Sequence, residues 1–84
     1  MKFRALVVDD DAGVRYTLAE IFGDAGLEVE LAEHGLRALQ FTRASRFDLV
    51  ITDLRMSPMD GLELLRVLRD EQPRLKVILV TAHG

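Results

Sequence analysis

The sequence contains no cysteine and no tryptophan, and only two of its 84 residues are proline. Without cysteine, neither a disulfide bond nor a cysteine-ligated zinc site can stabilise the chain. The fold must therefore be held together by packing of the apolar residues, which make up 49% of the chain. Because a chain of this size buries only about 60% of its unfolded surface, we expect one small domain with a narrow stability margin.

The sequence also lacks long apolar runs. The longest, at residues 5–8 and 77–80, have four residues each, whereas a helix needs about 20 to cross a bilayer. Residues 1–4 carry positive charge, but Asp9, Asp10 and Asp11 interrupt the apolar stretch that follows, which argues against a signal peptide. These absences predict a cytoplasmic chain that does not associate with membranes.

An excess of basic residues is missing as well, since 11 lysines and arginines stand against 14 acidic residues, for a net charge of −3. Bulk charge therefore gives no reason to expect direct binding to nucleic acid, which depends on neutralising phosphates. The arginines are scattered along the chain, and we interpret them as ordinary solvated positions. They include Arg37, Arg43, Arg46, Arg66, Arg69 and Arg74.

Four apolar segments predict β-strands. Residues 6–8, 49–51 and 77–80 are uninterrupted and rich in β-branched side chains, which is typical of parallel strands buried on both faces. Residues 27–31 instead alternate apolar and acidic positions. That alternation predicts an edge strand with one solvated face.

Between these segments, apolar residues recur every three or four positions and predict three helices. The first ends near Gly26, which suits a left-handed helix terminus, and the second covers residues 36–44. The third begins near Gly61, with Asp60 as its N-cap, and must stop before Pro73. The alternation of strands and helices predicts a single α/β domain with a parallel sheet and helices on both faces.

Polar side chains follow three of the predicted strands, at the point where each strand ends. Asp9 and Asp10 follow the first strand, Asp53 follows the third and Thr81 follows the fourth. Ligands of open α/β sheets bind at the carboxyl ends of the strands, so these groups should meet in one site. Three carboxylates repel one another unless a cation or a shared proton compensates, and an oxygen-only ligand set suits Mg²⁺. Asp53 could then attack phosphorus to form an aspartyl phosphate, with the Thr81 hydroxyl binding a phosphoryl oxygen.

A simpler interpretation exists for each acidic residue taken alone. An aspartate after a strand often caps the next helix, and Asp10 or Asp11 could do so here. The two histidines, His34 and His83, fall in loop-like positions and are interpreted as exposed spacers. With no histidine among the strand-end residues, zinc is not expected.

Three motifs together resemble the receiver domains of two-component response regulators. They are LVVDDD at residues 6–11, TDLRMSPMDG at residues 52–61 and VTAHG at residues 80–84. Their order and spacing agree with that family along the whole chain, and their wording looks most like regulators of the nitrogen-regulatory, enhancer-binding type. The resemblance implies a flavodoxin-like, doubly wound parallel sheet, whose full strand order is 2-1-3-4-5.

The resemblance also implies a role for each residue of the site. Asp53 would be the phosphoacceptor, and Asp10 would bind Mg²⁺ directly with it. Asp9 would act through water, the backbone carbonyl of Arg55 would supply a further metal ligand, and Thr81 would be the switch hydroxyl. The implied partners are a sensor histidine kinase and an output domain that binds DNA or activates transcription. The chain itself would be a signalling domain and not an enzyme.

Two features depart from the family pattern. Proline commonly follows the residue matching Met56, whereas Ser57 stands there and Pro58 comes next, so we expect a local difference in the backbone. The family's fifth-strand lysine and switch aromatic would lie beyond residue 84. Residues 1–84 are therefore expected to form a receiver-domain fragment of strand order 2-1-3-4, without the last helix, strand and helix. We expect slow phosphorylation of such a fragment and homodimers or larger oligomers formed through residues 77–80, including domain swapping.

Two other functions stay open on the sequence alone. A Mg²⁺-dependent phosphohydrolase also uses an aspartyl nucleophile, but such enzymes usually place a general acid two positions later, where this chain has Arg55. A purely structural or interaction module would use the acidic residues only as helix caps.

Overall fold

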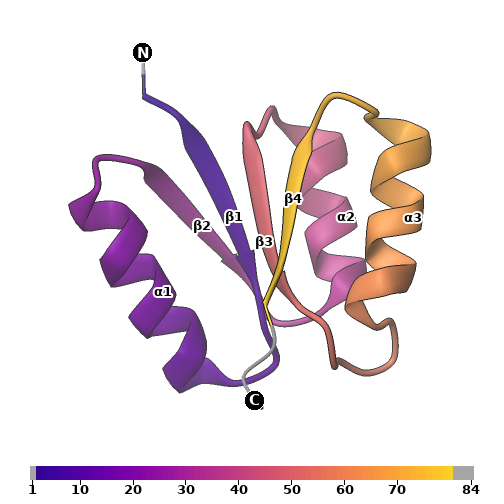
Figure 1. The fold of residues 1–84 in the computed structure, drawn as a ribbon, viewed down its shortest axis with the longest axis horizontal. Helices are drawn as coiled ribbons and strands as arrows, with labels where there is room; N and C mark the ends of the chain where they lie inside the picture. The colour runs from indigo at the N-terminus through magenta and orange to yellow at the C-terminus, as the bar shows by residue number, and fades with distance from the viewer. Residues whose placement is uncertain (1, 81–84) are drawn as a thin grey trace.

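The computed structural model describes residues 2–80, in which strands and helices alternate (Figure 1). The elements are β1 (Arg4–Val8), α1 (Ala12–Asp24), β2 (Glu28–Ala32), α2 (Gly35–Ala44), β3 (Leu49–Asp53), α3 (Gly61–Glu71) and β4 (Lys76–Val80). All the strand pairs are parallel, and the strands lie in the order β2-β1-β3-β4. The predicted α/β class and strand order are confirmed.

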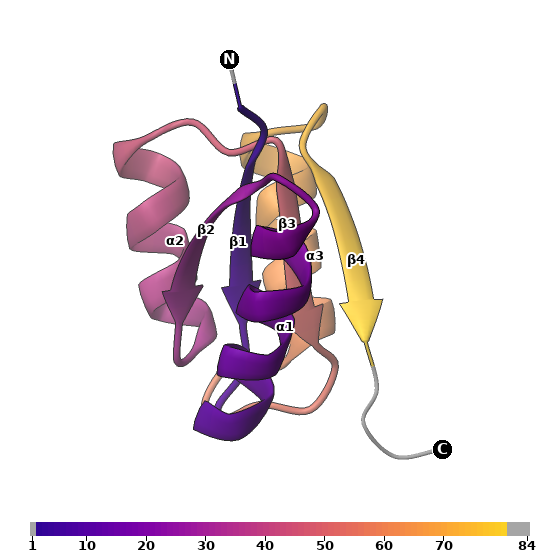
Figure 2. The ribbon, with the colours of Figure 1, turned by 90° about the vertical axis from the view of Figure 1, so that its left-hand side faces the viewer.

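The helices cover both faces of the sheet. Helix α1 lies on one face, whereas α2 and α3 lie side by side on the other (Figure 2). No helix within residues 2–80 is long and apolar enough to cross a membrane.

Strand β1 is buried on both faces, as its uninterrupted apolar sequence predicts. Ala5 and Val7 pack in the cluster beneath α1, while Leu6 and Val8 pack in the larger cluster beneath α2 and α3. Successive side chains of a strand point to opposite faces, so one short strand contributes to both halves of the core. All four are at most 1% exposed.

Strand β4 lies at an edge, as the strand order 2-1-3-4 expected for a receiver-domain fragment requires, and is not buried on both faces as its apolar composition alone predicts. Ile78 is 47% exposed and Leu79 is 37% exposed, and Val77 and Val80 are only half-buried. Within residues 2–80, β4 pairs with β3 alone and forms an edge of the sheet. An apolar sequence thus occupies an edge position here, because burial depends on the neighbours of a strand as well as on its composition.

The helix ends follow local sequence signals, with one correction. Asp60 is the N-cap of α3 and Gly26 adopts a φ of 95° after α1, both as predicted, and Glu63 completes a capping box with Asp60. His34, however, is not a mere exposed spacer. Its Nδ1 accepts a hydrogen bond from the Arg37 N–H at 3.0 Å and caps α2, a role more usually filled by serine, threonine or aspartate. His83 lies outside the described residues.

Candidate functional site

Asp9 is fixed at the end of β1 by its own backbone and side chain. Its N–H donates to the Ala32 carbonyl of β2 at 3.1 Å, and its Oδ1 accepts from the Asp11 N–H at 2.9 Å. The side chain is 5% exposed. Asp9 is therefore a buried carboxylate held in one orientation at the carboxyl edge of the sheet.

Asp11, two residues after Asp9, is the N-cap of helix α1. Its role distinguishes helix capping from ligand binding among Asp9, Asp10 and Asp11. The Asp11 Oδ1 accepts from the Val14 N–H at 3.1 Å, and Asp11 is the N-cap of α1. The capping role considered for Asp10 is thus filled by its neighbour, and Asp10 is exposed beside Asp9. Neither Asp9 nor Asp10 is used as a cap.

Asp53 lies at the same carboxyl end of the sheet as Asp9, because β1 and β3 are adjacent and parallel. Val8 pairs with Thr52, so Asp53 stands one residue beyond the last paired position of β1. A carboxylate oxygen of each of Asp9, Asp10 and Asp53 can be chosen so that the three atoms all lie within 4.8 Å of one another. The structure thus brings together three of the five residues assigned to the site from the sequence.

The folded protein disfavours the charged form of one member of the cluster, Asp9. The pKa of the Asp9 carboxyl is raised above its ordinary value, mainly because burial disfavours the charged form. The hydrogen bond from the Asp11 N–H acts in the opposite direction, and the carboxylates of Asp53 and Asp10 raise the pKa further. The donor set consists of oxygen atoms, one of them on a buried carboxylate that is hard to ionise without a cation. This chemistry fits Mg²⁺.

The loop after β3 closes tightly on Asp53 through a glycine. The Gly61 N–H donates to the Leu54 carbonyl oxygen at 2.9 Å. A Cβ atom at Gly61 would lie 2.3 Å from the Asp53 carbonyl oxygen and 2.9 Å from the Leu54 Cα, so only glycine allows this approach. The first residue of α3 thereby sets the position of the backbone that carries Asp53.

A groove of about 480 Å³ opens beside the cluster. Its lining includes Asp10, Arg55, Ser57 and Leu62, so the fourth assigned residue, Arg55, borders the same space as Asp10. The Ser57–Pro58 peptide bond in this loop is cis. Thr81, the fifth residue, lies outside the described residues.

Arg15 is a member of this region that the sequence analysis missed. Its Nη1 donates to the Asp9 carbonyl oxygen at 2.6 Å and ties α1 to the end of β1. The bond also places a cationic group next to the acidic cluster. The available signal was its position one turn after the cap Asp11, but spacing alone does not say which way an arginine side chain turns.

Comparison with known proteins assigns the family. The family model described as response regulator receiver domain matches residues 5–84. The chain belongs to the response regulator receiver domain family. Response regulator protein TrrA from Thermotoga maritima, solved in complex with Mg²⁺-BeF, superposes on this receiver domain with a TM-score of 0.93 and 39% identity, over 100% of the chain and 72% of that protein.

Curated relatives agree with this assignment. A response regulator receiver protein of Anaeromyxobacter sp. (strain Fw109-5) is 45% identical over 95% of the receiver domain and 34% of the relative's length. Sporulation initiation phosphotransferase F of Bacillus subtilis is 37% identical over 100% of the chain and 68% of its own length. The DNA-binding transcriptional regulator NtrC of Escherichia coli is 39% identical over 93% of the chain and 17% of its own length.

These matches confirm the resemblance to receiver domains, including relatives of the nitrogen-regulatory type. The chain spans about a third of the length of the Anaeromyxobacter relative and less than a fifth of the length of NtrC.

Proposed function

We propose that this receiver domain accepts a phosphoryl group on Asp53 from a sensor histidine kinase and passes the signal to an output domain. The observation that carries the proposal is the cluster of Asp9, Asp10 and Asp53, whose carboxylate oxygens lie within 4.8 Å of one another at the edge of the sheet where ligands bind in this architecture. Membership of the receiver family supports it. We place the domain in the cytoplasm, where the kinase would act.

Asp53 is the nucleophile in this proposal. One of its carboxylate oxygens forms a bond to phosphorus while the phosphorus–nitrogen bond of a kinase phosphohistidine breaks, and the electron pair of that bond goes to the imidazole nitrogen. The short closure at Gly61 holds the backbone of Asp53 in place during the reaction. Thr81 is proposed as the hydroxyl that binds a phosphoryl oxygen and signals its presence.

Asp10 and Asp53 would hold Mg²⁺ directly, Asp9 would act through water, and the Arg55 backbone carbonyl would add a ligand. Bound Mg²⁺ would neutralise charge on the phosphoryl oxygens. Asp9 orients this set, since it is the most buried of the three carboxylates and is fixed by the Asp11 N–H.

The output domain is proposed to control transcription, because one relative is named a DNA-binding transcriptional regulator. Residues 1–84 would then be the receiver part of a longer regulator.

The two alternatives are less well supported. A phosphohydrolase needs a general acid, and the exposed Arg55 stands two positions after Asp53, where such enzymes carry one. A purely structural role would require the clustered acidic residues to cap helices. The N-caps of the helices within residues 2–80 are Asp11, His34 and Asp60, none of which belongs to the cluster.

Magnesium titration tests the site directly. We expect the 84-residue chain to bind Mg²⁺ in isothermal titration calorimetry. Asp53→Asn should weaken binding about tenfold or more, because loss of a metal ligand costs at least as much affinity as loss of a residue that hydrogen-bonds to a ligand. Asp70→Asn, an exposed change on α3, serves as the matched control and should bind as the wild type does. Absence of binding, or equal binding by Asp53→Asn, would favour the structural role.

A further inference from the structure

Asp10 lies in a short link between two regular elements. Strand β1 ends at Val8 and helix α1 begins at Ala12, so Asp10 belongs to neither, and its side chain is exposed. The hydrogen bonds of a strand ladder or of a helix therefore do not fix its backbone. A metal ligand, however, binds tightly only when it is held in its productive orientation. Contacts from elsewhere in the chain are needed to orient Asp10.

Arg15 forms hydrogen bonds to the link on both sides of Asp10. Its backbone N–H donates to the Asp11 carbonyl oxygen at 3.0 Å, in the first turn of α1. Its half-buried side chain turns back toward the sheet, and Nη1 donates to the Asp9 carbonyl oxygen at 2.6 Å. A hydrogen bond from a charged donor is about twice as strong as one between neutral groups. Arg15 thus holds the link by its backbone and by its side chain.

The second of these bonds acts on the peptide unit that carries Asp10. The Asp9 carbonyl belongs to the planar unit that joins Asp9 to Asp10, so fixing its oxygen fixes the plane from which the Asp10 side chain projects. The flanking residues are held as well. The Asp9 N–H donates to the Ala32 carbonyl oxygen at 3.1 Å, and the Asp11 N–H donates to the Asp9 Oδ1 at 2.9 Å.

The positive charge of Arg15 would by itself oppose metal binding. A guanidinium next to a cation site repels a divalent ion, so its removal should strengthen Mg²⁺ binding if charge alone decides. Positioning acts with the opposite sign, because a loosely held ligand must be ordered when the ion binds. These opposite signs allow one measurement to separate the two effects.

We propose that Arg15 is a positioning residue for Asp10 and raises the affinity of the acidic cluster for Mg²⁺. The inference rests on the proposed function, in which Asp10 is a direct ligand of Mg²⁺. The bond from Arg15 to the Asp9 carbonyl oxygen holds the Asp10 carboxylate close to that of Asp53, and the resulting gain in affinity exceeds the repulsion between the guanidinium and the ion. Arg15 itself contacts neither the ion nor the phosphoryl group.

Isothermal titration calorimetry of the full-length protein with MgCl₂ tests this role. We expect Arg15→Met to weaken Mg²⁺ binding about tenfold, as does the loss of other residues that orient metal ligands. Methionine is a long side chain with a helix propensity close to that of arginine, but it has no donor. Arg15→Lys keeps a charged donor and should bind Mg²⁺ more tightly than Arg15→Met does.

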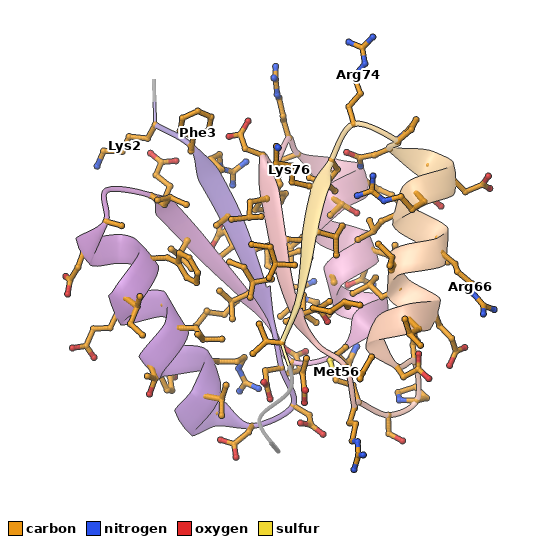
Figure 3. All side chains as sticks on the ribbon, in the orientation of Figure 1. Lys2, Phe3, Met56, Arg66, Arg74 and Lys76 are labelled. Atoms are coloured by element: carbon orange, nitrogen blue, oxygen red, sulfur yellow. The ribbon has the colours of Figure 1, made fainter. Side chains whose placement is uncertain are left out.

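Two matched variants control for other effects of substitution. Arg66→Met removes a charge from the outer side of α3 (Figure 3) and should bind Mg²⁺ as the wild type does. Thr17→Val removes a bond within α1, from the Thr17 hydroxyl to the Gly13 carbonyl oxygen at 2.9 Å, and should also bind as the wild type does. Circular dichroism checks that each variant is folded.

A second measurement requires no metal. Nuclear magnetic resonance relaxation of the metal-free protein should give the Asp10 amide an order parameter of about 0.85 in the wild type, as for rigid backbone, and a lower value in Arg15→Met. An unchanged order parameter would overturn the positioning role. So would Mg²⁺ binding by Arg15→Met that equals or exceeds that of the wild type or equals that of Arg15→Lys, or equal weakening by Thr17→Val. Absence of Mg²⁺ binding by the wild type would instead overturn the proposed function, and with it the effect of Arg15 on metal affinity.

Discussion

Asp9 is an acidic residue whose charged form is disfavoured in the folded chain. Its carboxyl is buried beside two other carboxylates, and its pKa is raised relative to the unfolded chain. The unfolded state therefore loses this proton first as pH rises. It follows that Asp9 contributes stability below its unfolded pKa, near 3.9, and that this contribution is lost as pH rises through the higher pKa of the folded state.

Asp9→Asn should therefore stabilise the fold near neutral pH when Mg²⁺ is absent. Asparagine keeps an oxygen that can accept from the Asp11 N–H but carries no charge, and we expect a gain on the order of 1 kcal/mol in the free energy of unfolding. Thermal unfolding followed by circular dichroism should show this gain near pH 7 and its disappearance below about pH 3.9.

Glu20→Gln, an exposed neutralisation on α1, is the control and should change stability little at either pH. Added Mg²⁺ should reverse the order, because it would stabilise the wild type more than Asp9→Asn. A variant that is less stable than the wild type near neutral pH without Mg²⁺ would contradict this explanation of the site.

At the scale of elements, the junction between β3 and α3 controls the position of Asp53. A methyl group at Gly61 would collide with the Asp53 carbonyl oxygen and the Leu54 Cα, which are backbone atoms that cannot rotate away. We expect Gly61→Ala to lower the free energy of unfolding by roughly 1–3 kcal/mol and to weaken Mg²⁺ binding, as measured by urea unfolding and calorimetry.

Gly23→Ala is the matched control for that change. Gly23 lies in α1, where an added Cβ would meet no atom within 4 Å, so alanine should leave stability unchanged or raise it by up to about 1 kcal/mol. Equal destabilisation by both substitutions would show that the close approach at Gly61 is not the cause.

Sequence patterns were sufficient for elements whose structure is decided by neighbouring residues or by a clear repeat of apolar positions. The two-sided burial of β1, the N-cap at Asp60 and the end of α3 before Pro73 were all predictable, because apolar spacing, capping side chains and proline act within a few residues. The convergence of Asp9, Asp10 and Asp53 could also be predicted, since parallel strands bring their carboxyl ends to one edge.

Other features could not be predicted from local sequence patterns. The exposure of Ile78 does not follow from the apolar composition of β4, although the strand order 2-1-3-4 expected for a receiver-domain fragment places that strand at an edge. The bond from Arg15 to the Asp9 carbonyl depends on the rotamer that a long side chain adopts across a turn.

At the scale of the whole molecule, the exposed edge at β4 predicts association of the 84-residue chain. Ile78 and Leu79 present apolar surface beside a strand that pairs on one side only within residues 2–80, and such edges pair readily with another chain. We expect light scattering at micromolar concentration to show dimers or larger species.

Ile78→Lys should shift that population toward monomer, because a charge at an edge opposes strand pairing. Ile21→Lys replaces an isoleucine on α1 that is 55% exposed and should leave the population unchanged. A folded monomer in the wild-type chain would contradict the predicted association.

The central proposal is that Asp53 accepts a phosphoryl group from a phosphodonor, with the help of Mg²⁺ held by the acidic cluster. The most direct measurement is the intact mass of the full-length protein after incubation with acetyl phosphate. With Mg²⁺, the wild type is expected to gain one phosphoryl group, and the gain should vanish in Asp53→Asn and after chelation of the metal. The claim is contradicted if the wild type gains no phosphoryl group, or if Asp53→Asn gains one as readily as the wild type does.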